Sequence, residues 1–384
     1  MSNDPTPDRL RRSDPPLSGE GKGRLILLCA GGTGGHLFPA EALAVALEKR
    51  GAAIELATDV RVAQFKFPAR AVHVIPSATL RARNPFAFAR TSALLALGIM
   101  KAWALIGRIR PAVVVGFGGY PTVPPLLAAS LRGVPTVLHE QNGVMGRANR
   151  MLAPRVTTIA TSFRTLGNLD PGLQAKVTFT GNPVRPQVIA AAETLYAPPA
   201  SSERLKLLVF GGSQGAHVMA EIVPAAIERL SESLRARLSI VQQARAEDID
   251  AVRAAYGKLG VAAECAPFFA DLPARMAAAH LIVSRSGAST VAELSAIGRP
   301  AILVPLPHAL DQDQFANAGV LAQAGGAIRI EQRDFTPERL ASDLERLAAD
   351  PLRLAHMAQA AKSAGTIDAA ERLADLVMKV AGMG

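Results

Sequence analysis

Short apolar runs alternate with amphipathic stretches along most of the chain. The apolar runs are typical of buried strands, and they lie at 25–30, 54–58, 72–75, 113–116, 136–139, 157–160, 177–180, 205–210, 238–242, 261–264, 281–284 and 301–304. Helical spacing is found at 38–50, 86–108, 122–131, 144–152, 216–230, 247–259, 289–297 and 314–323, and again after residue 337. Strands that alternate with helices form parallel sheets covered on both faces, so we predict an α/β fold.

Two of these apolar runs end in a glycine cluster, at Gly31–His36 and at Gly211–Gly215. Glycine lets backbone N–H groups at the start of the next helix approach a phosphate or a sugar, and the helix dipole favours negative charge there. Two such clusters predict two nucleotide-type domains that face each other across a cleft. The expected order is a disordered tail at 1–22, a first domain at 23–190, a linker at 191–203, a second domain at 204–360, and a last helix at 361–384 that could return to the first domain.

Composition narrows the class of protein. The chain has 384 residues, more than one hydrophobic core usually serves, and 49% of them are hydrophobic. Its two cysteines, Cys29 and Cys265, lie far apart in apolar runs, which fits a reducing cytoplasm rather than a disulfide framework. The first 22 residues lack the apolar segment of a signal peptide.

The formal net charge of +10 points to an anionic partner. No aromatic-basic motif, zinc knuckle or recognition helix accompanies this charge, so we do not expect nucleic acid. The anionic partner that the charge predicts is therefore a membrane surface or a phosphorylated substrate.

Neither glycine cluster matches the dinucleotide or P-loop pattern, which disfavours a dehydrogenase or a kinase. The second does match G-x-S-x-G, with Ser213 at the position of a hydrolase nucleophile. Such a hydrolase also needs an acid and a histidine downstream, and Asp271, His280 and His308 have no distinguishing setting. A serine hydrolase therefore stays an alternative.

No metal or other cofactor is expected. Asp311 and Asp313 have the spacing of a carboxylate pair that could hold a metal, but Asp248 and Asp250 repeat this spacing in an ordinary polar stretch. The chain also lacks C-x-x-C and H-E-x-x-H motifs.

Candidate chemistry lies at two helix starts. His36 ends the first glycine cluster, where a neutral imidazole could take a proton from an attacking hydroxyl; a packed or capping histidine is the alternative, and the adjacent glycines favour catalysis. Ser289 and Thr290 follow an apolar strand and could hold a pyrophosphate, with Glu293 accepting hydrogen bonds from a ribose. The residues alone favour a different role for Glu293, a capping box with Thr290.

Six segments together resemble the MurG family of peptidoglycan N-acetylglucosaminyltransferases, in order and spacing from about residue 24 to the end. They are Gly31–His36, His139–Asn142, Gly181–Arg185, Gly211–Ala216, Arg285–Glu293 and Asp313–Asn317. The resemblance implies a GT-B fold with two Rossmann-like domains. It implies inverting transfer of N-acetylglucosamine from UDP-N-acetylglucosamine to the 4-hydroxyl of the muramoyl sugar of lipid I, giving the β1,4-linked lipid II.

The same resemblance implies site residues in both domains. From the first domain, Thr33, Gly34 and Gly35 would line the cleft, His36 would be the general base, and Asn142 and Arg185 would contact the donor. From the second, Ser213 would contact the donor, the backbone near Phe269 the uracil, Ala288, Ser289 and Thr290 the phosphates and sugar, Glu293 the ribose, and Gln314 the N-acetylglucosamine hydroxyls. This chain departs from the family pattern at Asp313, where relatives often carry His or Gln, so the resemblance assigns no contact to that side chain.

Because the implied acceptor carries a lipid, we expect the apolar segment from Phe86 to Arg108 to contact the membrane. Arg90 and Lys101 interrupt it, so we do not expect it to cross a bilayer. We expect peripheral attachment to the cytoplasmic face of the inner membrane, near other proteins of cell-wall synthesis. The membrane-facing residues would be Leu95, Ile99, Trp103 and Arg108, flanked by Arg81, Arg83 and Arg110; the alternative is an ordinary buried helix.

Two further interpretations remain open beside the hydrolase. A related GT-B enzyme could act on diacylglycerol or another lipid through the same donor site. A non-catalytic membrane scaffold would bind UDP-sugar weakly or not at all.

Overall fold

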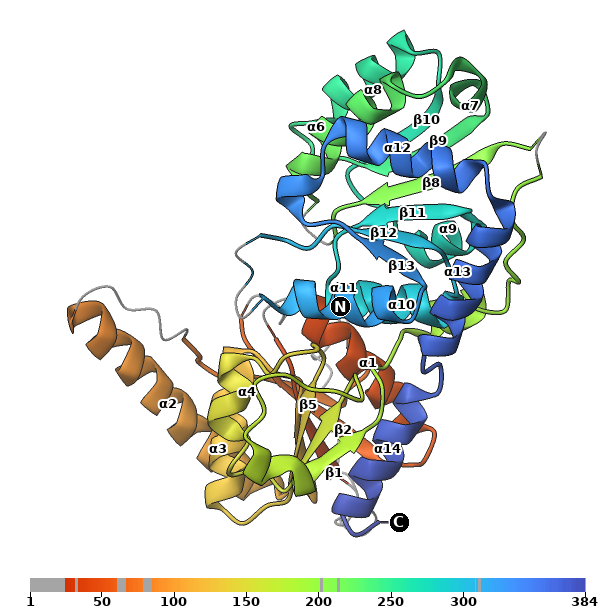
Figure 1. Ribbon diagram of the computed structural model, residues 1–384. Helices are drawn as coiled ribbons and strands as arrows, with labels where there is room; N and C mark the ends of the chain where they lie inside the picture. The colour runs from red at the N-terminus through yellow and green to blue at the C-terminus, as the bar shows by residue number, and fades with distance from the viewer. Residues whose placement is uncertain are drawn as a thin grey trace, which may run out of the picture.

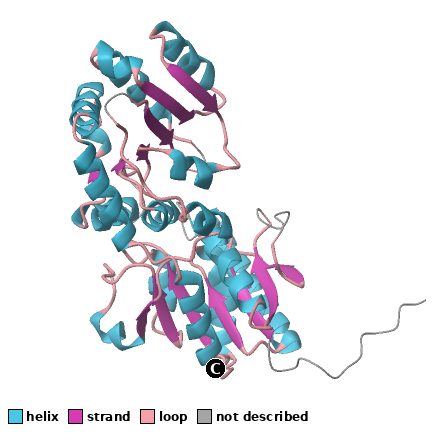
Figure 2. Cartoon of the chain, turned by 90° about the vertical axis from the view of Figure 1, so that its right-hand side faces the viewer, coloured by secondary structure: helices cyan, strands magenta, loops and turns pink. Residues whose placement is uncertain are grey.

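The computed structural model describes residues 25–31, 34–60, 67–78, 85–200, 203–212, 215–307, 309 and 312–383. These residues form two lobes, each built on one sheet (Figures 1 and 2). The first sheet contains β1 (Leu25–Cys29), β2 (Ala53–Thr58), β3 (Ala71–Val74), β4 (Val113–Gly116), β5 (Thr136–Glu140), β6 (Thr158–Thr161) and β7 (Val177–Phe179). The second contains β8 (Leu205–Phe210), β9 (Leu238–Gln243), β10 (Ala262–Ala266), β11 (Leu281–Ser284), β12 (Ala301–Leu303) and β13 (Ala327–Arg329).

Both sheets are parallel and share one topology. The strand order is β3-β2-β1-β4-β5-β6-β7 in the first lobe and β10-β9-β8-β11-β12-β13 in the second. In each sheet the strands are added first toward one edge and then toward the other. The strand order therefore reverses beside the first strand, between β1 and β4 and between β8 and β11. Open α/β sheets bind ligands at the carboxyl ends of the strands beside such a reversal. The α/β prediction is confirmed, and each lobe has one expected site.

Helices cover both faces of each sheet. In the first lobe they are α1 (Gly34–Glu48), α2 (Pro85–Ile109), α3 (Val123–Leu131) and α4 (Arg147–Leu152). The second lobe has α5 (Pro186–Ala191), α6 (His217–Glu228), α7 (Glu232–Ala236), α8 (Ile249–Lys258), α9 (Leu272–Ala278), α10 (Ala288–Ile297), α11 (Asp313–Gln323), α12 (Pro337–Ala348) and α13 (Pro351–Ala364). The last helix, α14 (Ala369–Val380), lies on the first lobe (Figure 1).

The chain crosses between the lobes twice, and the first crossing comes earlier than the expected linker at 191–203. Helix α5 packs on α9 and α10, and Val188 and Ala191 belong to a core cluster of the second lobe. The crossing therefore lies in the proline-containing segment 181–186, because burial of α5 and not local composition decides where the second lobe begins. The return crossing lies at 365–368, after which α14 packs on α1.

Differences from the predicted elements have local causes. The sequence pattern missed β13 and the short helices α5, α7 and α9, each of seven residues or fewer. Such elements are too short to show a period. Helix α1 begins at Gly34 rather than near residue 38, so His36 lies in its first turn. The tail at 1–22 lies outside the described residues.

Candidate active site

The loop after β1 and the loops after β4 and β5 meet around His36. The imidazole is half-buried, and its Nδ1 lies 3.0 Å from Oε1 of Gln141, which follows β5. Its other edge lies against the backbone of Gly118 and Gly119, which follow β4: a Cβ atom built on Gly119 would be 3.4 Å from His36 Nε2. Both glycines have positive φ angles, of 82° and 73°, which favour glycine.

The environment of His36 favours its neutral form. Burial lowers the pKa of His36 below its ordinary value, and this effect is only partly opposed by hydrogen bonds with Gln141 and the Phe117 carbonyl and by the negative charge of Asp313. Neighbouring His139 is fully buried, and burial lowers its pKa to about 4. At neutral pH His36 is therefore able to accept a proton.

The start of α10 faces this histidine from the second lobe. Gly287 is the N-cap, and no side chain caps the helix there, so the first backbone N–H groups keep the positive end of the dipole. Ser289 Oγ lies 3.4 Å from the carbonyl oxygen of Gly35 in α1 and donates a hydrogen bond to it. The two helix starts therefore meet across the boundary between the lobes, with Ala288, Ser289 and Thr290 half-buried beside it.

The capping-box interpretation of Glu293 is wrong. Thr290 is the third residue of α10 rather than its N-cap, so it cannot form a capping box with Glu293. Glu293 is buried, and its Oε1 accepts a hydrogen bond from Nη2 of Arg185 at 3.0 Å. Burial raises the pKa of Glu293, and the Arg185 charge opposes this. Arg185 also covers the ring of Phe38 in α1, so it links both lobes at the site.

A buried carboxylate that the sequence interpretation did not assign holds the loop after β5. Glu140 accepts hydrogen bonds from the backbone N–H of Asn142 and Gly146, both at 3.0 Å, and from the side-chain amides of Asn142 and Asn149. Burial raises the pKa of Glu140, whereas these four donors lower it. The fixed loop presents Asn142 at the lobe boundary.

Asn317, in α11, completes a contact between the lobes. It is fully buried; its Oδ1 accepts the Gly143 N–H at 2.8 Å, and its Nδ2 donates to Oδ1 of Asn142 at 3.1 Å and to the Ser286 carbonyl at 3.3 Å. The Asn142 side chain is thus held by groups from both lobes. Both residues lie in segments that carry the family resemblance, His139–Asn142 and Asp313–Asn317, but the sequence alone did not indicate these contacts.

Two further donor-binding candidates belong to the second lobe. Gln314 is half-buried at the start of α11; its Oε1 accepts from the Leu306 N–H and its carbonyl from Ser286 Oγ. Phe269 precedes α9, and its buried ring packs under the Arg275 guanidinium at 4.2 Å. The Phe269 side chain is thus packed within the lobe, and the interpretation from the sequence uses its backbone and not its ring.

Thr33, Ser213, His308 and Asp311 lie outside the described residues. The hydrolase interpretation loses its other candidates. Nδ1 of His280 accepts the Lys206 N–H at 3.1 Å, which places it at the amino end of β8, away from the glycine turn. Asp271 pairs with Arg275. In the part of the chain that the structure describes, no group of three or more His, Cys, Asp or Glu side chains could hold a metal ion.

Helix α2 presents a surface of its own. Leu95 packs against the first-lobe core and Ile99 is half-buried, because the core-facing stripe of the helix continues through Ala102 and Ile106. The outward side carries other apolar side chains. These exposed residues are Phe88, Leu94, Leu97, Met100 and Trp103.

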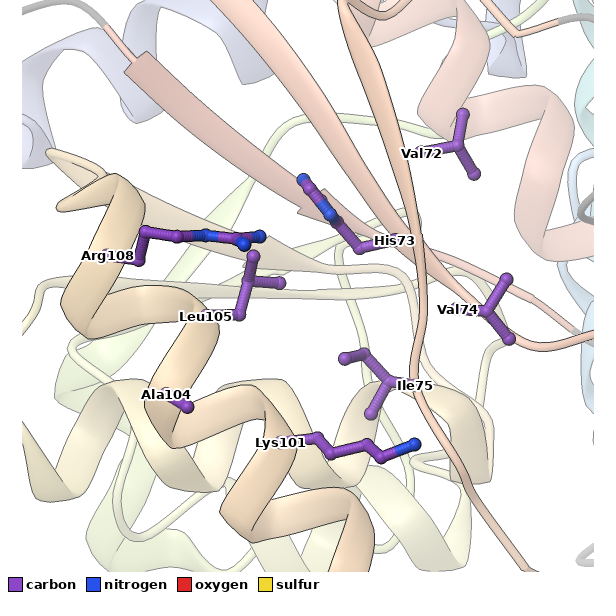
Figure 3. Close-up of a pocket in the computed structure, with 8 residues that line it drawn as sticks. All are labelled: Val72, His73, Val74, Ile75, Lys101, Ala104, Leu105 and Arg108. Atoms are coloured by element: carbon purple, nitrogen blue, oxygen red, sulfur yellow. The ribbon is translucent and has the colours of Figure 1, made fainter.

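A pocket of about 450 Å³ separates α2 from the edge strand β3. Lys101 and Arg108 line it from the helix, and Figure 3 shows His73 and Ile75 pointing from the strand toward them. Arg110 follows the helix, whereas Arg81 and Arg83 lie outside the described residues. The pocket therefore combines apolar walls with two cations.

Length and composition do not exclude a membrane crossing by α2. Its segment Phe88–Ile109 is 22 residues long and, although it contains Arg90 and Lys101, is apolar enough to span a bilayer by those two measures. Part of the helix is nevertheless packed on the first lobe. The buried residues Ala102, Leu105 and Ile106 make this helix part of the first-lobe core, and it lies along α3.

Comparison with known proteins agrees with this architecture. Residues 26–161 match the glycosyltransferase family 28 N-terminal domain, and residues 206–373 match its C-terminal domain. A UDP-N-acetylglucosamine–N-acetylmuramyl-(pentapeptide) pyrophosphoryl-undecaprenol N-acetylglucosamine transferase of Rhodopseudomonas palustris is 61% identical over 361 residues, which cover 94% of this chain and 96% of that protein. A protein of the same name from Nitrobacter hamburgensis is 60% identical over 93% of this chain and 97% of its own length.

A solved structure supports the same relationship. The crystal structure of Acinetobacter baumannii MurG superposes with a TM-score of 0.74 at 29% identity, covering 93% of this chain and 99% of that one. The two parallel sheets with a site at the boundary between them are the GT-B arrangement. The chain is a glycosyltransferase that belongs to glycosyltransferase family 28 and, within it, to the MurG family.

Proposed function

We propose that this enzyme transfers N-acetylglucosamine from UDP-N-acetylglucosamine to the C4 hydroxyl of the muramoyl sugar in undecaprenyl-pyrophosphoryl-MurNAc-pentapeptide. The reaction converts lipid I to lipid II and forms a β1,4 linkage with inversion. The observation that carries the proposal is the meeting of two helix starts, at which Ser289 of the second lobe reaches Gly35 of the first. The names of relatives about 60% identical over nearly the whole chain support the substrate pair.

Inversion needs a base and a leaving-group site on opposite sides of the anomeric carbon. His36 Nε2 would take the proton of the acceptor hydroxyl while its oxygen bonds to C1 of the donor sugar. The C1–O bond to the pyrophosphate breaks, and UDP leaves with the electron pair. The start of α10, the Ser289 hydroxyl and the Arg185 guanidinium would stabilise its negative charge.

Donor recognition would use the remaining groups at the boundary. Glu293 has a second carboxylate oxygen beside the one held by Arg185, and we propose that it accepts hydrogen bonds from the ribose. Asn142 and Gln314 would face the sugar, with Thr33 and Gly34 lining the cleft and Ser213 contacting the donor. The backbone beside Phe269 would meet the uracil.

Transfer from radiolabelled UDP-N-acetylglucosamine to lipid I, with diacylglycerol as the alternative acceptor, tests the proposal. We expect lipid II from lipid I and no product from diacylglycerol. Calorimetry with UDP-N-acetylglucosamine distinguishes an enzyme from a scaffold that does not bind it. Labelling by a fluorophosphonate that Ser213→Ala abolishes would instead support a hydrolase.

We also propose that the enzyme attaches peripherally to the cytoplasmic face of the inner membrane through α2. Exposed apolar side chains on this helix suit the lipid interface, and Lys101 and Arg108 suit anionic headgroups. Attachment there would place the chain beside other proteins of cell-wall synthesis, which we propose as further partners. The chain's net charge of +10 has the sign this requires.

Sedimentation with vesicles of phosphatidylglycerol and phosphatidylcholine tests this attachment. Met100→Asp and the pair Lys101→Glu, Arg108→Glu should reduce the bound fraction several-fold. Arg235→Glu, on α7 of the other lobe, removes the same kind of charge and should change binding little. Losses that follow the change in net charge, whichever lobe carries it, would mean that total charge alone attracts the protein.

A further inference from the structure

Gln141 lies between His36 and a backbone carbonyl, almost fully buried. Its Nε2 lies 2.7 Å from the carbonyl oxygen of Phe117, and its Oε1 lies 3.0 Å from Nδ1 of His36. The three groups come from the ends of β4 and β5 and from the first turn of α1. They form a short chain of hydrogen bonds that ends at the imidazole.

The direction of these hydrogen bonds is fixed by chemistry. The Phe117 carbonyl can only accept, so the Gln141 NH₂ group must face it, and the Gln141 oxygen must then face His36. That oxygen has no hydrogen to give, so His36 Nδ1 must carry the proton in their hydrogen bond. In a neutral imidazole the lone pair then lies on Nε2.

We propose that Gln141 is a positioning residue that holds neutral His36 as the tautomer with hydrogen on Nδ1 and a free lone pair on Nε2. Nε2 is the ring nitrogen beside Gly119, where a Cβ atom would lie 3.4 Å from it, so the absence of a side chain at Gly119 leaves this nitrogen uncovered for an acceptor hydroxyl. The tautomer itself follows from the two hydrogen bonds of Gln141, whatever the reaction. Its catalytic meaning rests on the proposed transfer reaction.

An amide has a different effect from a carboxylate at this position. A carboxylate would attract the protonated imidazole, whereas the neutral Gln141 orients the ring with much less stabilisation of its charge. Among the residues that the structure describes, two other titratable groups act on or respond to His36: Asp313 from α11, which favours the protonated form, and His139 from β5, whose pKa a charged His36 lowers. Gln141 therefore selects a tautomer in an environment that keeps the base neutral.

Nitrogen NMR of imidazole-¹⁵N-labelled protein tests the tautomer without any substrate. A spectrum of His36→Gln, compared with the wild type, assigns the His36 signals. We expect a protonated Nδ1 and an unprotonated Nε2 at pH 7 in the wild type, and a mixture of tautomers in Gln141→Met. A proton on Nε2 of the wild-type ring, or the same single tautomer in Gln141→Met, would overturn the proposal.

Kinetics then separates positioning from packing. Gln141→Met should lower kcat on the order of 10–100-fold with less than about a twofold change in donor KM. Loss of the Gln141 hydrogen bond should also move the acid limb of the pH profile to lower pH, because that bond raises the His36 pKa. The control is Gln242→Met, which removes an equally buried glutamine bound to Met219 and Tyr256 in the second lobe and should leave the pH profile unchanged.

The outcomes also separate this inference from the proposed function. A wild type with the expected tautomer but no transfer to lipid I would contradict the function and leave the role of Gln141 in selecting the tautomer intact. Active enzyme whose Gln141→Met and Gln242→Met variants lose equal activity, with unchanged pH profiles, would make Gln141 a packing residue and refute the inference.

Discussion

His36 and Glu293 lie on opposite lobes, and their surroundings give them separate tasks. Nε2 of His36 lies beside the backbone of Gly119, whereas the Glu293 carboxylate is buried against Arg185. A base should act on the reaction rate and a ribose acceptor on donor affinity. Mutant kinetics can therefore tell the two roles apart.

His36→Ala should lower kcat by about 10²- to 10⁴-fold while changing donor KM little, because it removes the proton acceptor and no donor contact. In the wild type, kcat/KM should fall only as the pH drops below the lowered pKa of His36, since the neutral form is the active one. A pH series on both enzymes measures this. An acid limb that persists in His36→Ala would assign the titration to another group.

Glu293→Ala should raise donor KM by about 10- to 100-fold, since it removes hydrogen bonds to a charged acceptor and leaves Arg185 unpaired. Glu293→Gln keeps an acceptor for Arg185 and should lose less. Calorimetric affinity for UDP, beside the kinetics, is the measurement. Equal donor KM in the wild type and both variants would contradict the ribose assignment.

At the scale of elements, a close contact between α2 and the segment after β3 explains why a glycine occurs inside this helix. Gly98 lies in the middle of α2, where glycine normally weakens a helix. A Cβ atom there would lie 2.1 Å from the Pro76 carbonyl oxygen, so only glycine lets the helix lie against the segment that follows β3. The pocket that Lys101 and Arg108 line lies between the same helix and β3.

Gly98→Ala should therefore lower the free energy of unfolding by about 1–3 kcal/mol, although alanine favours helix. Gly257→Ala is the matched control: Gly257 lies in α8 with nothing within 4 Å of a built Cβ, and this change should stabilise by up to about 1 kcal/mol. Urea denaturation measures both. Stabilisation by Gly98→Ala would mean that α2 is not held against Pro76.

How much the sequence could predict depends on which interactions decide each feature. Long apolar runs located most strands to within two residues, because parallel strands buried on both faces need them. Segments such as α7 and β13 depend on tertiary packing and carry no period of their own. His36 could be singled out from its glycines, but the role of Gln141 could not, because it arises from a contact between residues 105 positions apart.

At the scale of the whole molecule, the C-terminal helix joins the fold of the first lobe. Helix α14 packs on α1, and its residues Leu373, Ala374 and Val377 are fully buried in a cluster with β1 and β4 side chains. The chain therefore passes from the first lobe to the second and back. The stability of the histidine side of the cleft thus depends on residues more than 300 positions away in sequence.

Leu373→Ala tests this dependence. Removal of a fully buried leucine should cost about 2–5 kcal/mol, and the loss should fall on the first lobe although the residue lies near the C-terminus. Hydrogen exchange should quicken in β1 and β4, while β8 and β11 stay protected. Leu344→Ala is the control, because Leu344 in α12 is equally buried but belongs to the second-lobe core, and the exchange pattern should reverse. Faster exchange in both lobes for either variant would show that the lobes unfold as one cooperative unit. The loss of stability would then extend beyond the lobe that contains the cavity.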